Sequence, residues 1–260
     1  MSERPSTGSE HEPVTIEVTV GAPIETVWSY LRDPELISRW HGWVADELEQ
    51  EIDFIYRGHA HESATPYVLE MDRGSEGSVD GGDRFELFAA DGTNGADGPT
   101  TVRITRGARG SDEIWDAWYD DITEGWTSFL NQLRFTLEVQ PERLRRTVFL
   151  NVDGAGLPSV RQALGLSGVA FSAPYAAAGG DLDLSGRGWF VSAHQVGVTV
   201  DTLGPGLVIA ADKPDQTGAS KGAMVIVSTY GQDEAAFART VQQWGQWWKA
   251  QYPAGSGPQT

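Results

Sequence analysis

The sequence contains no cysteine, so it can form neither a disulfide nor a thiolate metal site, and it has no thiol nucleophile. It is also poor in basic residues, with 19 lysines and arginines against 37 aspartates and glutamates and a formal net charge of −18. No run approaches the ~18 apolar residues that span a bilayer. A surface of this charge repels phosphate backbones and anionic membranes. We therefore expect no nucleic-acid partner, no membrane partner and a cytoplasmic location.

The length and composition predict two compact units. The chain has 260 residues, of which 40% are hydrophobic, and this is enough for two domains of ordinary size. Residues 1–12 are polar and charged without an apolar core, so we interpret them as a disordered leader and not as a signal peptide. We place the domains at 13–141 and 142–253, followed by a flexible tail at 254–260.

Residues 14–43 have the pattern of a strand followed by two short helices. Apolar and polar residues alternate between Thr15 and Val20, which is typical of a half-buried strand. Pro23 ends this strand and suits a first helical turn. In residues 24–31 the apolar positions recur at i, i+3, i+4 and i+7, so they form one face of a helix. Asp33 then caps a second helix that begins with a proline.

This segment resembles the opening of the START/SRPBCC helix-grip superfamily, in the branch of activators of the heat-shock-protein-90 ATPase. In that branch a strand ending in A-P-x-E-x-V-W leads to D-P-E-L-x-x-R-W. The residues that match are Ala22, Pro23, Glu25, Val27, Trp28, Asp33, Pro34, Glu35, Leu36, Arg39 and Trp40.

A long amphipathic helix is predicted over residues 123–138, and it resembles the helix that closes the family's domain. Its apolar face is made by residues at i, i+3, i+4, i+7 and i+11, which are Trp126, Phe129, Leu130, Leu133 and Leu137. Its polar residues are expected to face away from the sheet, and they are Ser128, Asn131, Gln132 and Arg134. The family's tail often reads E-G-W-x-x-x-L-x-x-L, and Glu124, Gly125, Trp126, Leu130 and Leu133 match it.

The resemblance covers residues 13–140 and implies a fold and a cavity. In the family, an antiparallel sheet wraps around the closing helix and leaves an apolar cavity between the two. We therefore expect an α+β helix-grip unit here, with strand-like runs at 67–71, 84–88 and 101–105.

Residues 142–253 follow the same order of elements in shortened form. An alternating strand at 146–152 comes first, three β-rich runs follow, and a helix at 233–252 closes the chain. Its Phe237, Val241, Trp244 and Trp248 have the spacing of the first closing helix. This repetition favours two tandem helix-grip copies. The alternative is that two amphipathic helices agree only because they share one period.

Three groups of titratable residues were weighed as chemical sites. His59 and His61 would face one side of a strand, but no fourth metal ligand is evident, so a solvent-facing loop is favoured. The acidic residues in 112–121 lack the order and the glycine of a calcium loop, so we interpret them as solvated. His41 has no recognisable carboxylate partner, and a surface position is favoured over a proton-transfer role. No metal and no cofactor are expected.

The aromatic residues are the remaining functional signal. The resemblance places a hydrophobic small molecule in the cavity of the first unit, with the second unit as scaffold or interface. The residues expected to line that cavity are Trp28, Trp40, Phe54, Tyr56, Tyr67, Phe85, Trp115, Trp126, Phe129, Leu130 and Leu133.

Three functions follow in order of preference. The first is non-enzymatic binding of a hydrophobic small molecule, or a chaperone-linked stress role, because the family signatures are present without a catalytic constellation. The second is a polyketide cyclase- or dehydratase-like enzyme, which requires His41, Tyr56 and Tyr67 to converge in the cavity. The third is an acidic protein-interaction module that docks on an ATPase chaperone or a transcription factor.

Overall fold

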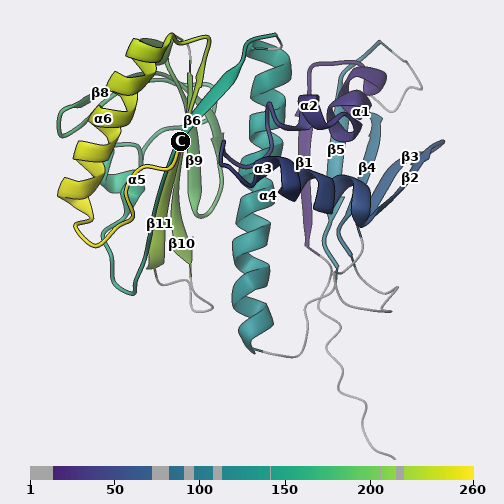
Figure 1. Ribbon diagram of the computed structural model, residues 1–260, viewed down its shortest axis with the longest axis horizontal. Helices are drawn as coiled ribbons and strands as arrows, with labels where there is room; N and C mark the ends of the chain where they lie inside the picture. The colour runs from purple at the N-terminus through teal and green to yellow at the C-terminus, as the bar shows by residue number, and fades with distance from the viewer. Residues whose placement is uncertain are drawn as a thin grey trace, which may run out of the picture.

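The computed structural model describes residues 14–71, 82–90, 97–107, 113–140, 142–204, 206–214 and 220–260. It has an α+β architecture of two antiparallel sheets with one long helix between them and another on the outer face of the second sheet (Figure 1). The fold is two copies of a helix-grip arrangement, as the sequence predicts. Among the described helices, none combines the length and the apolar character that crossing a membrane requires.

The first sheet has the strand order β1-β5-β4-β3-β2. Its strands are β1 (Thr15–Val20), β2 (Ala60–Ala64), β3 (Tyr67–Met71), β4 (Arg84–Ala89) and β5 (Thr100–Thr105). Between β1 and β2 lie the helices α1 (Ile24–Arg32), α2 (Pro34–Ile37), α3 (Leu48–Asp53) and the π-helix η1 (Phe54–Gly58). As expected, Asp33 caps α2, and its side chain accepts a hydrogen bond from the Glu35 backbone N–H at 2.9 Å.

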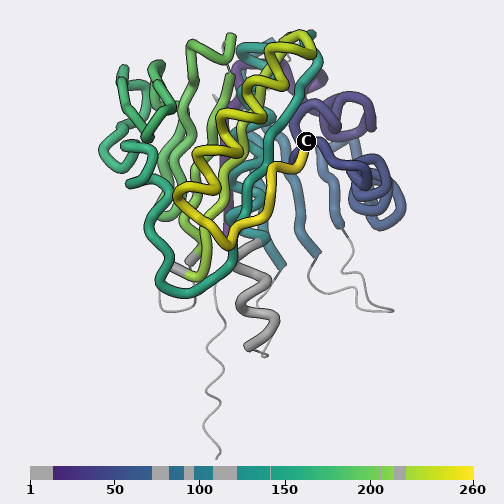
Figure 2. The backbone as a smooth tube through the Cα atoms, turned by 60° about the vertical axis from the view of Figure 1, so that its left-hand side comes forward, coloured from purple at the N-terminus to yellow at the C-terminus, as the bar shows by residue number. Residues whose placement is uncertain are grey.

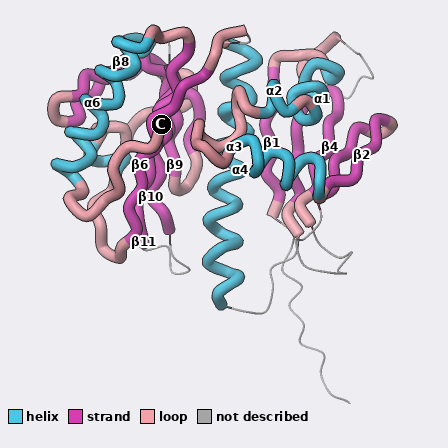
Figure 3. The backbone as a smooth tube through the Cα atoms, viewed as in Figure 1, coloured by secondary structure: helices cyan, strands magenta, loops and turns pink. Residues whose placement is uncertain are grey.

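The second sheet has the strand order β6-β11-β10-β9-β8-β7. Its strands are β6 (Arg145–Asp153), β7 (Pro174–Gly179), β8 (Leu182–Val191), β9 (Gln195–Val200), β10 (Gly206–Pro214) and β11 (Ser220–Tyr230). The helices of this half are α5 (Val160–Ala163), the short 3-10 helix η2 (Asp201–Leu203) and α6 (Glu234–Gln251). Figure 3 shows this sheet between α6 and the long helix α4 (Glu113–Val139).

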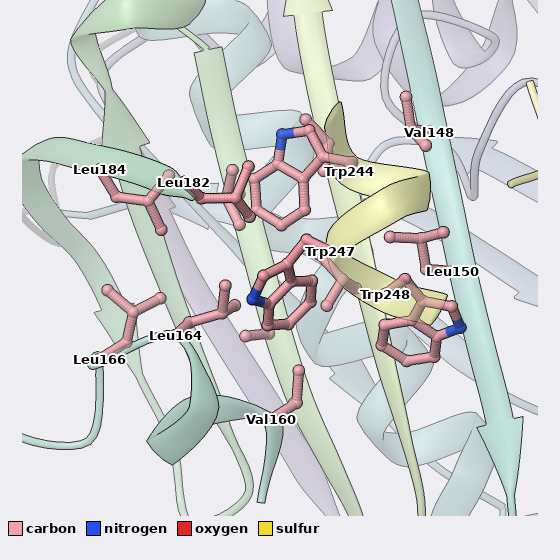
Figure 4. Packing of buried hydrophobic residues seen from close by; sticks show 14 of the residues in the cluster. Val148, Leu150, Val160, Leu164, Leu166, Leu182, Leu184, Trp244, Trp247 and Trp248 are labelled. Carbon is pink, nitrogen blue, oxygen red and sulfur yellow. The ribbon is translucent and has the colours of Figure 1, made fainter. Parts of the chain in front are cut away.

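The core under α6 is built around three tryptophans. Trp244, Trp247 and Trp248 are buried and point into the second sheet (Figure 4). Aliphatic side chains from β6, β8 and α5 surround them, including Val148, Leu150, Leu164, Leu182 and Leu184. This half therefore closes around its own tryptophans.

Helix α4 is shared by both sheets. Trp126, Leu130 and Leu133 belong to the core of the first sheet, whereas Phe135 belongs to a separate core with Ile209 and other residues of the second sheet. In Figure 2 the tube of the second sheet passes close to α4, in agreement with the contacts that α4 makes with β9 and β10. The two sheets are thus joined through opposite sides of one helix.

Three of the four polar residues of α4 that were expected to face away from the first sheet are buried, because the second sheet covers that side of the helix. Ser128, Asn131 and Gln132 are buried, and Arg134 is half-buried. The Ser128 hydroxyl donates to Gln195 Oε1 at 2.6 Å, so its polar group is satisfied across the interface with the second sheet. A polar helix face indicates water only if no second layer supplies hydrogen-bond partners.

The C-terminal residues, expected to be a flexible tail, lie along the outer edge of β6. Gln259 and Phe149 exchange two backbone hydrogen bonds at 2.9 and 3.0 Å, and Ser256 N–H donates to the Asn151 carbonyl at 3.1 Å. The tail thereby covers the backbone groups of a strand that would otherwise be a free edge.

Candidate functional site

A groove of about 600 Å³ lies between the two sheets, on one side of α4. Its lining comes from β1, α4, β8 and the segment before β7, and it includes Ile16, Val18, Thr127, Asn131, Arg134, Glu138, Phe171, Phe190 and Val191. No single half of the chain makes this groove, because its walls are more than 150 residues apart in the sequence. Its size falls within the range of small-molecule sites, roughly 300–1,000 Å³.

The groove has an exposed apolar rim. Phe171 is 58% exposed and Val191 is 51% exposed, although both are large hydrophobic residues. Ile16 and Val18 add half-buried aliphatic surface from β1. Exposed apolar side chains that gather at a concave surface indicate a binding site more strongly than the same residues scattered singly.

Arg134 and Glu138 form a fixed polar pair on the floor of the groove. The Arg134 Nε–H donates to both carboxylate oxygens of Glu138 at 3.1 and 3.2 Å. The Arg134 guanidinium lies 4.2 Å from the ring centroid of Trp189 and 5.7 Å from that of Phe171. Stacking on aromatic faces holds a guanidinium in one plane. Glu138 also accepts a hydrogen bond from the Gly21 backbone N–H at 2.8 Å.

A second candidate group of residues lies on another side of α4, where His41 is buried. His41 is 1% exposed, so the prediction of a surface histidine is wrong. Its Nδ1 lies 3.0 Å from the Tyr56 hydroxyl, and its Nε2 lies 3.2 Å from Glu51 Oε1. Its ring also packs at 4.8 Å, centroid to centroid, from Phe129.

These partners define the protonation of His41. Glu51 can only accept, so Nε2 carries the proton and Nδ1 accepts from the Tyr56 O–H. Burial lowers the pKa of His41 below its usual 6.5, although the hydrogen bond that His41 donates to Glu51 opposes this effect. Burial also raises the pKa of Tyr56 well above 10, so the phenol stays protonated. The result is a chain of hydrogen bonds from the Glu51 carboxylate, which is partly exposed, through a neutral imidazole to the buried Tyr56 phenol.

The structure brings most of the predicted cavity residues together. Trp40, Tyr56, Phe85, Trp126, Leu130 and Leu133 are buried in one cluster, and Trp28, Tyr67 and Phe129 are half-buried at its edge. Phe85 and Trp126 pack edge to face at 5.1 Å. These side chains contact one another, and their role in ligand binding stays a prediction.

One of the predicted cavity residues lies elsewhere, another is outside the side chains that the structure describes, and Tyr67 lacks the expected partners. Phe54 is 55% exposed and packs on His59, so it does not enter the cluster. Trp115 lies in the first turns of α4, outside the side chains that the structure describes. Tyr67 hydrogen bonds to Glu25 and packs on Trp28, and it does not meet His41. Among the described residues, no group of three or more His, Asp or Glu side chains is placed to hold a metal.

Sequence reasoning missed Glu51 and the groove for different reasons. Glu51 lies on α3, a short helix that was not predicted, ten residues after its histidine partner. Its position in an L-E-Q-E-I-D stretch, with apolar residues at i and i+4, was the available signal. The groove has no local sequence signal, since β1, α4 and β8 meet only in the folded chain.

The fold and the groove define an α+β helix-grip protein with two sheets and a ligand-sized cleft between them. The sequence matches no protein-family model and no curated protein. Among solved structures, the chain is similar to the di-domain ARO/CYC protein BexL from the BE-7585A biosynthetic pathway. The two sequences are 12% identical, the match covers 94% of this chain and 99% of BexL, and the TM-score is 0.37. It is also similar to DynU16, from the dynemicin biosynthetic locus, with 16% identity, coverages of 88% and 93%, and a TM-score of 0.28.

A Bordetella parapertussis protein, solved in solution by NMR, is similar with 20% identity over 54% of this chain and 81% of its own, at a TM-score of 0.33. At TM-scores below 0.5 we take no functional conclusion from these similarities. The branch of heat-shock ATPase activators stays a prediction.

Proposed function

We propose that the protein binds a hydrophobic small molecule in the groove between β1, α4 and β8. The observation that carries this proposal is the concave site of about 600 Å³ with Phe171 and Val191 exposed on its rim. Burial of apolar surface from ligand and rim contributes roughly 25 cal/mol per Å². The Arg134–Glu138 pair adds a polar contact that fixes the orientation of the ligand.

The net charge of the chain limits which ligand charges are compatible with the groove. With a formal net charge of −18, the protein repels anions and attracts cations at long range. Within the groove, the Arg134 charge is already neutralised by Glu138. An uncharged or weakly cationic ligand therefore fits the groove better than an anion.

Replacing Phe171 with alanine should weaken binding of a neutral apolar dye such as Nile red by about tenfold, or ~1.4 kcal/mol. The ring is exposed in the free protein, so its loss removes ligand contact without opening a core. Dye fluorescence measured against protein concentration gives the dissociation constant of each variant. Leu144→Ala is the matched control, because Leu144 is 74% exposed and lies outside the groove. Equal affinity in both variants would contradict a groove site.

A second function is favoured by one contact, the hydrogen bond between His41 and Tyr56. In this alternative the protein is a cyclase- or dehydratase-like enzyme for a polyketide-like substrate, with His41 as the base that moves a proton. A neutral imidazole fixed by two hydrogen bonds has the properties of a general base. BexL is named as an ARO/CYC protein, but this alternative rests on the His41 contacts of the chain itself.

An NMR titration of the five histidines checks the protonation that this alternative needs. His41 should titrate below 6.5, and Glu51→Gln should lower its pKa further, because the carboxylate stabilises the imidazolium. Since the unfolded chain binds the proton first, the free energy of unfolding should fall as the pH drops below about 6.5. A His41 pKa above 7 would remove it as a neutral base at physiological pH.

A further inference from the structure

The outer edge of β1 has backbone groups without partners in the described chain. The Arg106 N–H donates to the Val14 carbonyl at 2.8 Å, and this bond sets the phase of the β1–β5 ladder. In an antiparallel pair, the residues between hydrogen-bonded positions direct their N–H and C=O groups to the other side. Glu17 and Thr19 are such residues, so their backbone groups point away from β5.

The same reasoning applies to the end of β8. The Ser192 N–H donates to the Gln195 carbonyl at 2.9 Å, and Val191 faces Val196 in the next position of the ladder. The backbone N–H and C=O of Val191 therefore point away from β9. Strand β7 pairs with β8 only up to Arg187, so it does not cover this position.

Both strand edges border the groove. Four consecutive residues of β1, from Ile16 to Thr19, line it, as do Phe190, Val191 and Ser192 at the end of β8. Successive side chains of a strand point to opposite faces, so consecutive lining residues mean that the groove meets the edge of the strand. The Gly21 N–H, on the same edge of β1, already donates to the Glu138 carboxylate. The backbone N–H groups on this edge of β1 can therefore donate hydrogen bonds to an acceptor that lies beside α4.

We propose that the ligand of this groove is a short extended peptide, which binds as an added strand along β1. The proposal deepens the small-molecule function above and rests on it, because the site is the same. About five residues of an extended chain cover ~17 Å, which matches the length of β1 from Thr15 to Thr19. An edge that offers alternating N–H and C=O groups is complementary to an amide backbone and to few other apolar ligands.

The side chains around the groove select the peptide. Alternate residues of an added strand point toward α4, where Ile16 and Val18 present aliphatic surface. The others point outward beside Glu17, which already pairs with Arg103. The net charge of −18 disfavours acidic side chains at these outer positions. The peptide is therefore apolar at every second residue and neutral or basic between.

The test compares Glu17→Pro with Glu17→Ala. Proline removes the outward N–H of Glu17 and no bond of the β1–β5 ladder, and proline is tolerated at such an edge position. The probe is the acetylated and amidated pentapeptide Val-Lys-Val-Lys-Val, with its dissociation constant measured by NMR titration. The proline variant should bind it about tenfold more weakly than the alanine variant, as expected for one lost hydrogen bond, because both variants lack the Glu17 carboxylate and only proline lacks the N–H.

Two further measurements separate this inference from the function on which it rests. A peptide N-methylated at the residue that faces Glu17 should lose the same affinity on the natural chain, and this holds even if the proline variant unfolds. The natural chain should bind Nile red whether or not it binds the peptide. If the natural chain bound the N-methylated and the unmethylated peptide equally, or bound neither, the strand proposal would be overturned. Nile red binding by the natural chain would in that case still support the groove. Loss of Nile red binding by the natural chain would overturn the groove itself.

Discussion

An Arg145→Met variant should lose roughly 3–5 kcal/mol of its free energy of unfolding, because a buried cation holds the segment before α3 against the second sheet. The Arg145 side chain is buried at the start of β6. Its guanidinium donates to four backbone carbonyls and one amide at 2.6–3.3 Å, which are those of Ser38, Trp40, His41, Gly42 and Gln132. Removing it takes the donor from the Ser38 and His41 carbonyls, whereas the Gln132 amide still donates to the carbonyls of Trp40 and Gly42.

The stability cost of Arg145→Met measures the contribution of a buried cation that is held by hydrogen bonds and not by a counter-ion. Among the described residues, no carboxylate pairs with Arg145, and burial lowers its pKa to about 10. The side chain nevertheless remains charged at pH 7. Methionine would relieve the desolvation of that charge, so the net loss is smaller than five hydrogen bonds would suggest.

Denaturant unfolding of three variants checks this prediction. Arg146→Met is the matched control, since Arg146 is partly exposed and pairs with exposed Glu234, and it should cost at most ~1 kcal/mol. Arg145→Lys should recover only part of the stability, because one ammonium group cannot reach carbonyls on both sides of the fork. If Arg145→Met and Arg146→Met were equally stable, the hydrogen bonds of Arg145 to the segment before α3 would make no net contribution to the free energy of unfolding.

The sequence predicted the elements with a clear period and missed those without one. The stripe of Trp126, Leu130 and Leu133 predicted the buried side of α4, and the matching stripe through Trp244 predicted α6. Strand β7 was missed because its P-Y-A-A-A-G sequence has neither β-branched residues nor an alternation of apolar and polar side chains.

Residues whose partners lie far away in the chain could not be assigned from the sequence. Gln132 appeared to belong to a solvated helix face, yet its Nε2 donates to the carbonyls of Trp40 and Gly42 at 3.0 Å. Its amide is satisfied by a turn that lies more than 80 residues earlier in the chain. Arg145 is a further example, because its guanidinium donates to the carbonyls of Ser38 and His41, more than 100 residues earlier in the chain.

The position of α4 also changes what a substitution on this helix should do. If α4 belonged to the first sheet alone, a change on its far side would be a surface change. Phe135 lies on that far side, is fully buried, and packs at 5.3 Å from Trp189 and 5.5 Å from Tyr230, centroid to centroid. Both of those partners belong to the second sheet.

Phe135→Ala should therefore cost ~3–5 kcal/mol, as large as the ~2–5 kcal/mol expected for Leu133→Ala on the opposite side. Because the two sheets share α4, both substitutions should lower the protection of amides in β3 and in β10 against hydrogen exchange. Val139→Ala, partly exposed at the end of the same helix, is the control and should change neither. If Phe135→Ala lowered protection only in β10 and Leu133→Ala only in β3, the halves would unfold separately. In that case α4 would connect the two sheets without coupling them.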